Sequence, residues 1–231
     1  YYRISCRKST LKNIFRKVID KAKQVRGGLA SQVEESISQS DFIVLSNENW
    51  GRVCSNKPLE LHGIYKFSSL LIGRHKDRLI GISDCRKYVV KIGIAELDRK
   101  SHDILSELEV ISRLNKAGCE SCPKLIHAGT VAVSELSTML EDDVGKNVLE
   151  CGREELDWFI LEYIETQDKV PFADVLFSLI EQKRLGVYQG DIKPANLRFS
   201  NNGVCFIIDY DQAVELDAGI SHLSFSEFLS W

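Results

Sequence analysis

The sequence has few prolines, a single methionine and no long hydrophobic run. With 4 Pro and 15 Gly in 231 residues, of which 44% are hydrophobic, the chain is not collagen-like, of low complexity or wholly disordered. No stretch approaches the roughly 18 consecutive apolar residues of a membrane span, and no apolar run follows the basic residues near the N-terminus. We therefore expect neither a transmembrane helix nor a secretory signal. A chain of this length can bury a full core without disulfide or metal staples.

The seven cysteines are an odd number and lie mostly within apolar segments. This favours free thiols in a reducing compartment over a disulfide framework, so we expect a cytoplasmic location. Cys119 and Cys122 have the spacing of zinc ligands, but no second pair follows, and His127 alone leaves the four-ligand shell incomplete. We interpret the two as thiols in a loop. The five histidines form no Ser/His/Asp pattern that would support hydrolase chemistry.

Charge is unevenly distributed along the chain. Residues 1–30 hold nine Lys or Arg against one acid, a net charge of +8, whereas the whole chain has a net charge of −3. Residues 10–26 place apolar side chains at helical spacing, which predicts a basic amphipathic helix. Such a helix suits an anionic membrane surface or a protein partner, although ordinary packing with one solvated face is its commoner use. Nucleic acid ranks below these partners, because no aromatic interleaving or reading motif accompanies the charge.

The remaining pattern predicts mixed strands and helices. Residues 29–60 are polar and mixed, with one strand candidate at 41–45, and form a lead-in segment. Beyond them, short β-rich runs alternate with turn sequences, which predicts an antiparallel meander, and a Gly after Asn predicts a tight hairpin turn at residues 201–203. The expected strands are 68–72, 79–83, 88–92, 124–126, 158–164, 197–199 and 204–208, and the expected helices are 98–117 and 172–184.

Four polar residues stand close together between residues 188 and 209. Asp191, Lys193 and Asn196 fall on a short loop, and Asp209 follows an apolar strand. Transfer of the γ-phosphoryl group of ATP needs such groups: oxygen ligands hold Mg²⁺ on the phosphates, a carboxylate orients the attacking hydroxyl, and a cation stabilises the moving group. Carboxylate and amide oxygens suit Mg²⁺. Singly these are ordinary turn residues, but their order points to this chemistry.

This segment resembles the catalytic loop and metal motif of the protein kinase-like superfamily. The family's loop reads H-R-D-x-K-x-x-N and its metal motif D-F-G, and residues 189–196 here read QGDIKPAN and residues 209–211 read DYD. The resemblance runs in order from about residue 64 to residue 213. It implies that Asp191 is the catalytic base and Lys193 a phosphate-facing cation. Asn196 and Asp209 are then the ligands of Mg²⁺.

The upstream residues agree with this resemblance. Lys91, in a strand of Val, Tyr and Ile, matches the lysine that binds the α- and β-phosphates, and a buried ammonium needs a carboxylate partner. Glu107 and Glu109 are both available on the next helix, and we choose Glu107 because it precedes Leu114 by seven positions, as the family's glutamate precedes a Leu. Residues 158–164 resemble the hinge, where the carbonyl of Glu162 and the amide of Ile164 would read the adenine edge.

The sequence departs from the family in several places. The glycine-rich loop is absent, and the turn at 73–78 carries His75, Lys76 and Arg78, which would have to grip phosphate by charge. Gly190 replaces the usual Arg, Tyr210 follows the metal Asp in place of Phe, and no A-P-E occurs. The 22 residues after Asp209 are too few for the usual activation segment and helical substrate lobe.

The acceptor class stays open at this point. Gly190-Asp191 resembles kinases of small molecules and sugars, including aminoglycoside, choline and lipopolysaccharide-core kinases. Lys193-Pro194, by contrast, resembles protein Ser/Thr kinases.

The sequence therefore predicts a two-lobed α+β fold of the protein kinase-like kind. We expect a basic helix and lead-in segment at 1–60, an N-lobe with a small antiparallel sheet at 61–164, and a reduced helical C-lobe at 165–231. The expected activity is ATP- and Mg²⁺-dependent phosphorylation of an alcohol, either protein Ser/Thr or a sugar hydroxyl. The alternative function is a pseudokinase or nucleotide-binding scaffold that docks a partner through residues 10–26. The protein could also lie peripheral to a membrane. Since the sequence begins without Met, a fragment of a larger enzyme is a further alternative.

Overall fold

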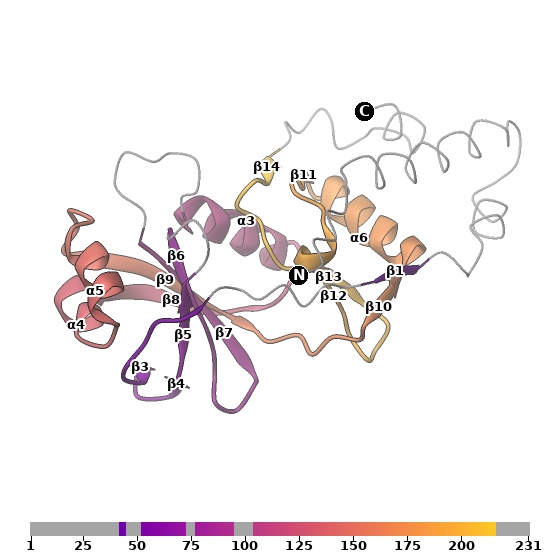
Figure 1. The fold of residues 1–231 in the computed structure, drawn as a ribbon. Helices are drawn as coiled ribbons and strands as arrows, with labels where there is room; N and C mark the ends of the chain where they lie inside the picture. Colours follow the sequence, from indigo (N-terminus) through magenta and orange to yellow (C-terminus); the bar gives the residue numbers. More distant parts are fainter. Residues whose placement is uncertain (1–41, 45–51, 73–76, 95–103, 216–231) are drawn as a thin grey trace, which may run out of the picture.

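The computed structural model describes residues 42–44, 52–72, 77–94 and 104–215. The predicted basic helix at 10–26 and most of the basic turn lie outside these residues. The described residues form two lobes, with a strand-rich N-lobe at one end and α6 (Phe172–Arg184) at the other (Figure 1). This confirms the predicted two-lobed α+β architecture, with an antiparallel sheet in one lobe and few helices in the other. No helix among the described residues is long and apolar enough to cross a membrane.

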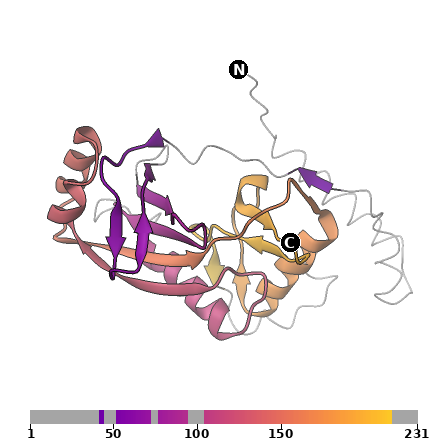
Figure 2. The ribbon, with the colours of Figure 1, turned by 90° about the horizontal axis from the view of Figure 1, so that it is seen from below.

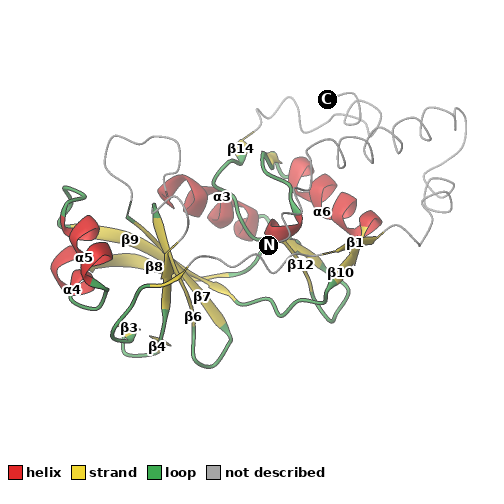
Figure 3. Cartoon of the chain, in the orientation of Figure 1, coloured by secondary structure: helices red, strands yellow, loops and turns green. Residues whose placement is uncertain are grey.

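The N-lobe is built on an antiparallel sheet whose six described strands follow the order β2-β5-β6-β7-β9-β8. The predicted meander is its middle part, because each β-rich run is paired with the next across a turn. Figure 3 shows these strands gathered on one side of the molecule. The sheet strands are β2 (Arg52–Val53), β5 (Leu70–Ile72), β6 (Arg78–Ile82), β7 (Tyr88–Gly93), β8 (Leu125–Ala132) and β9 (Glu155–Glu162).

The lead-in segment contributes to both lobes. Strand β2 pairs with β5, and the thiol of the fully buried Cys54 donates to the backbone oxygen of Leu70 at 3.4 Å. A hairpin of β3 (Leu59–Leu61) and β4 (Tyr65–Phe67) follows and buries its apolar side chains in the same core. Sequence reasoning placed residues 52–60 outside the N-lobe, whereas the structure builds them into it.

Strand β9 separates the two hydrophobic cores that the described residues form. Successive side chains of a strand point to opposite faces. Trp158 and Ile160 pack into the core of the N-lobe sheet, while Phe159 and Leu161 pack into the second core, beneath α3 (Ile104–Lys116) and α6. Both faces of β9 are buried, which explains its nearly continuous hydrophobic sequence.

Helix α3 turns one polar residue into the interior. Its buried side chains recur at helical spacing and are Ile104, Glu107, Val110, Ile111 and Leu114. Glu107 therefore lies on the buried stripe, where all the remaining side chains are apolar. Glu109, in contrast, is exposed. The helix presents this carboxylate toward the sheet.

The sequence analysis missed a helical insertion between β8 and β9. Helices α4 (Val133–Ser137) and α5 (Asp142–Leu149) pack against one end of the sheet, far from α6 in Figure 2. Isolated helices of this length are not stable, so local periodicity is a weak signal for them. Their stability comes from the burial of Leu136, Val144 and Val148 in the N-lobe core.

The second lobe combines α6 with short paired strands. The predicted hairpin is confirmed as β12 (Leu197–Phe199) paired with β13 (Cys205–Ile207), and Gly203 in its turn has φ of +80°. Ahead of it comes the short helix η2 (Pro194–Asn196). The other strands pair two by two: β1 (Phe42–Val44) with β10 (Lys169–Pro171), and β11 (Val187–Tyr188) with β14 (Val214–Glu215).

Candidate functional site

A pocket of about 80 Å³ lies between the N-lobe sheet, the segment after β9 and the β12–β13 hairpin. Ile80 and Ile82 of β6 and Val89 of β7 line one side, and Ile208, directly after β13, lines another. Lys91 also lines the pocket, so a largely apolar space adjoins a cationic group. An apolar pocket with a few convergent polar groups is the usual form of a small-molecule site.

The segment that leaves β9 borders the same pocket. Glu162 and Ile164, the two residues predicted to read the edge of a base, both line it. The backbone amides of Glu162 and Tyr163 are already used, because they donate to the carbonyls of Lys124 and Lys87 at 2.9 and 2.8 Å. Within the described part of the chain, no hydrogen bond engages the amide of Ile164. This amide is therefore the donor in that segment that a ligand can use.

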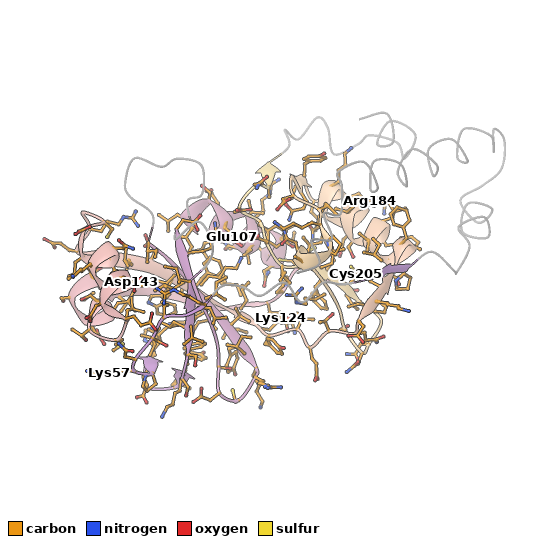
Figure 4. The ribbon with its side chains drawn as sticks, in the orientation of Figure 1. Lys57, Glu107, Lys124, Asp143, Arg184 and Cys205 are labelled. Carbon is orange, nitrogen blue, oxygen red and sulfur yellow. The ribbon has the colours of Figure 1, made fainter. Side chains whose placement is uncertain are left out.

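Lys91, Glu107 and Asp209 meet beside the pocket from three distant parts of the chain. Nζ of Lys91 lies 2.5 Å from Oε1 of Glu107 and 3.1 Å from Oδ1 of Asp209. Glu107, labelled on α3 in Figure 4, has no exposed surface, and the Lys91 side chain is 3% exposed. The backbone amide of Tyr210 also donates to Oε1 of Glu107, at 3.2 Å. Sequence reasoning chose Glu107 over Glu109 for this pairing, and the contact distances agree.

Mutual charge favours the ionised forms of Lys91 and Asp209 despite their burial. Burial by itself lowers the pKa of Lys91, but the charges of Asp209 and Glu107 outweigh it, so the pKa is raised. Burial by itself raises the pKa of Asp209, but the charges of Lys91 and Arg78 outweigh it, so the pKa is lowered. The cluster therefore favours a charged ammonium at Lys91 beside a charged carboxylate at Asp209, whereas burial raises the pKa of Glu107.

Arg78 joins this cluster through contacts with carboxylates that the sequence analysis did not foresee. The sequence placed Arg78 in a turn, whereas the structure makes it the first residue of β6, with a side chain only 13% exposed. Its Nη1 lies 3.2 Å from Oε2 of Glu107 and 3.5 Å from Oδ1 of Asp209, and its Nη2 lies 3.6 Å from Oδ2 of Asp211. The polar residues next to Arg78 in the sequence indicate a turn. The sequence alone gives no sign that Arg78 contacts these three distant carboxylates.

The loop before the hairpin holds a second polar group. Oδ2 of Asp191 accepts hydrogen bonds from Nζ of Lys193 at 2.6 Å and from Nδ2 of Asn196 at 3.2 Å. Burial by itself lowers the pKa of Lys193, but the hydrogen bond to Asp191 and the charges of Asp191, Asp209 and Asp211 outweigh it, so the pKa is raised. The Lys193 side chain is 46% exposed, so it is available to a ligand in the solvent.

Two hydrogen bonds tie this loop to the backbone of Ile208 and Asp209. The amide of Ile208 donates to the carbonyl of Asn196 at 3.0 Å, and Nε2 of Gln189 donates to the carbonyl of Asp209 at 2.6 Å. No direct contact between Asp191 and Asp209 occurs in the described structure. The predicted polar residues thus form two groups, one on the sheet side and one on the loop, held together by the backbone of the hairpin.

Asp209 and Asn196 fit the requirements of Mg²⁺. Lys91 and Arg78 both contact Oδ1 of Asp209, which leaves Oδ2 for a metal. Nδ2 of Asn196 donates to the carbonyl and the carboxylate of Asp191, so its amide oxygen points elsewhere. No cluster of three or more His, Cys, Asp or Glu suited to a metal ion occurs among the described residues. A magnesium ion here would take its remaining ligands from phosphate and water, as Mg²⁺ commonly does.

Gly190 sits where only a glycine fits. A Cβ atom on this residue would lie 2.3 Å from the backbone oxygen of Gln212. The close approach arises because β11, just before the loop, pairs with β14, just after Gln212. The sequence showed that Arg is missing from this position, and the structure shows that the crowded backbone excludes any side chain.

Comparisons with known proteins give similarity of fold alone. No protein-family model matches the sequence, and no curated protein matches it. The chain is similar to the bifunctional kinase-methyltransferase WbdD, with a TM-score of 0.42, 12% identity and coverage of 71% of this chain and 38% of that chain. For monomeric WbdD the TM-score is 0.43 and the identity is 11%, and the match covers 83% of this chain and 48% of that chain. For a Stt7 homologue from Micromonas algae, soaked with ATP, the TM-score is 0.42 and the identity is 16%, and the match covers 74% of this chain and 54% of that chain.

The chain spans only 38% to 54% of the length of these solved structures. At such TM-scores the likeness says nothing of the site or its substrate, which depend on the contacts within this chain.

Proposed function

We propose that this chain is an ATP-dependent phosphotransferase that moves the γ-phosphate of ATP to the hydroxyl of an alcohol acceptor. The convergence of Lys91, Glu107 and Asp209 beside an apolar pocket carries this proposal. A buried ammonium held between two carboxylates is costly to build for stability alone. It is well suited to bind a polyanion at the mouth of a pocket that accepts an apolar, planar base.

The adenine base of ATP occupies the apolar pocket in this proposal. The carbonyl of Glu162 and the amide of Ile164 bind its edge, while Ile80 and Ile208 contact its faces. Lys91 lines the same pocket, so phosphates that leave it meet this ammonium and then Asp209.

Asp191 is the proposed catalytic base. Its Oδ2 is held by Lys193 and Asn196, which leaves Oδ1 to accept the hydroxyl proton of the acceptor. Lys193 is close enough to the acidic residues for their charges to raise its pKa, and it faces the phosphoryl group during transfer. Mg²⁺ on Asp209 and Asn196 would neutralise phosphate charge.

Protein Ser/Thr and sugar hydroxyls are the two proposed acceptor classes. The division into a lead-in segment at 1–60, an N-lobe at 61–164 and a reduced C-lobe at 165–231 remains our proposal, amended by the pairing of β2 with the N-lobe sheet and the burial of Cys54 and Leu59 in its core. The basic segment at 10–26 is proposed to contact an anionic membrane or a protein partner. The six described cysteines are all free thiols, which supports a cytoplasmic location.

The proposal is tested by incubating the purified protein with labelled ATP, Mg²⁺ and a panel of proteins and sugars. We expect label transfer by the wild type and a loss of about 10² or more in the Asp191→Asn variant, by analogy with deletions of comparable electrostatic groups. Asp168→Asn, an exposed change in the segment after β9, is the control and should leave transfer unchanged.

Two results would contradict this function. Transfer that persists in Asp191→Asn would remove the role of the base. ATP binding by the wild type without transfer to any acceptor would instead favour the nucleotide-binding scaffold, for which ATP raises thermal stability by mass action but is not turned over.

A further inference from the structure

Arg78 is a second buried cation in the cluster, and it contacts three carboxylates. Its guanidinium lies 3.2 Å from Glu107, 3.5 Å from Asp209 and 3.6 Å from Asp211. Lys91 alone would leave these three acids with an excess of two negative charges in a poorly solvated region. With Arg78 the excess falls to one, so the guanidinium offsets the cost of bringing the acids together.

Arg78 also lies on the face of β6 that lines the pocket. Side chains two positions apart in a strand share a face, and Ile80 and Ile82 line the pocket. Ile80 is paired with Lys91 across the sheet, and Arg78 is paired with Gly93, two residues further along β7. Arg78 therefore lies beside the pocket on the same face of β6, at the end of the strand where its guanidinium contacts Asp209.

This is the position of the phosphates of a nucleotide whose base fills the pocket. Because the sequence has no glycine-rich loop, backbone amides of that kind are not there to bind them. A guanidinium binds phosphate oxygens through two parallel hydrogen bonds, and its planar fork suits phosphate and carboxylate equally well. Arg78 can thus leave the carboxylates for phosphate without losing an anionic partner.

We propose that Arg78 is a phosphate-binding residue that stands in for the missing glycine-rich loop. In the free protein its guanidinium neutralises Asp209 and Asp211. When ATP binds, it transfers from those carboxylates to phosphate oxygens. This inference rests on the proposed ATP site.

The test measures binding, and its readout does not depend on turnover. Dissociation constants for adenosine, ADP and ATP are determined, with and without Mg²⁺, by calorimetry or displacement on the full chain. Arg78→Gln should weaken ATP and ADP binding about ten- to a hundredfold, as expected for a lost charge-assisted contact, while adenosine binding changes less than about twofold. Arg52→Gln is the matched control, because Arg52 also bridges two carboxylates, Glu141 and Asp143, but at an exposed edge of the sheet. It should leave all three constants unchanged.

Arg78→Lys covers the case in which Arg78→Gln does not fold, as judged by its melting curve without ligand. Lysine keeps the positive charge but lacks the planar guanidinium that makes two parallel hydrogen bonds. The ratio of the dissociation constants of adenosine and ATP should therefore fall several-fold. A preference unchanged from the wild type in the folded variant would overturn the role of Arg78 while leaving the ATP site intact. Equal weakening of adenosine and ATP would assign Arg78 to fold stability and also overturn it. A wild type that binds no ATP would defeat the proposed function itself, and this inference with it.

Discussion

Lys91 and Glu107 form an ion pair in which Nζ and Oε1 are 2.5 Å apart and neither side chain is more than 3% exposed. One comes from the fourth strand of the sheet order and the other from the buried face of α3. Since the desolvation of two charges offsets much of their attraction, the pair contributes little net stability. Its effect is to fix α3 against the sheet with a cation facing the pocket.

Removing one member of this pair should destabilise the protein strongly. Glu107→Gln leaves Lys91 buried without its nearest carboxylate, and we expect a loss of about 3 kcal/mol or more in the free energy of unfolding. Urea denaturation of the two proteins measures this. The exposed pair of Lys66 and Glu60, 3.6 Å apart, is the matched control, and Glu60→Gln should cost less than about 1 kcal/mol. Similar losses for the two changes would show that burial does not set the energy of the inner pair.

Gly190 should not tolerate even one added methyl group. Gly190→Ala places a Cβ against the backbone oxygen of Gln212, and relief requires the loop and β14 to separate. We expect a loss of about 1–3 kcal/mol, as for other overpacked positions, measured by thermal or urea unfolding. Gln212→Ala alone should change stability by less than about 0.5 kcal/mol, because this side chain is exposed. Combining the two changes should not rescue the protein, since the clash is with backbone; a rescue would refute this account.

Stability should fall at acid pH in part because of Glu181 on α6. Its carboxylate accepts hydrogen bonds from the amides of Glu120 at 2.9 Å and Ser121 at 3.1 Å. Burial by itself raises the pKa of Glu181, but hydrogen bonding with the Ser121 side chain, followed by the two amides, outweighs it, so the folded pKa lies below the unfolded one. The stabilisation is therefore complete above the unfolded pKa, about 4.3, and disappears as the pH falls through the folded value.

The Glu181→Gln variant isolates this effect. At pH 7 it should be less stable than the wild type by about 1 kcal/mol, a figure reduced for the partial exposure of the group. Urea midpoints taken from pH 7 downward should converge as the wild-type carboxylate is protonated. A gap that stays constant below pH 4 would mean that the charge of Glu181 is irrelevant.

Among the described cysteines, Cys85 should react fastest with thiol reagents. It is exposed. Hydrogen bonding with the Ser83 side chain lowers the pKa of its thiol most, and the backbone amide of Lys87 lowers it further. Burial raises the pKa of Cys54 and Cys119 to about 11, and of Cys205 to about 12, so few thiolates are present there at neutral pH.

Brief alkylation of the native protein at pH 8, followed by mass spectrometry, tests this order. Modification of Cys85 should precede that of the buried thiols, and denaturation should remove the difference. The Cys85→Ser variant is the control. Rapid labelling of Cys119 in the folded protein would contradict its burial.

The sequence predicted the elements whose signals are local. The hairpin of β12 and β13 follows from Asn202-Gly203 and two short β-rich runs, and α6 was predicted with its observed ends. The hairpin and α6 depend on neighbours within a few turns or residues, so periodicity and turn chemistry suffice for them. Glu107 was chosen differently, because its spacing from Leu114 resembles that of the family's glutamate.

What the sequence could not show depends on contacts between distant segments. Arg78 stands in a polar run typical of a turn, yet it is buried by carboxylates 29 and 131 positions away, those of Glu107 and Asp209. Helices α4 and α5 are stable only against a core that residues from β3 to β9 assemble. Likewise, the need for glycine at position 190 arises from the return of the chain at Gln212.

The pairing of β1 with β10 gives the two lobes a second connection, which is held at one end by backbone hydrogen bonds. β1 is hydrogen-bonded to β10 after the hinge, while β2, which begins only eight residues after Val44, belongs to the N-lobe sheet. Eight residue steps span at most about 28 Å, so this strap restricts how far the lobes can swing apart about the hinge. A shortened chain that starts after residue 44 would therefore lose a strand from the C-lobe and gain freedom of opening at the cleft.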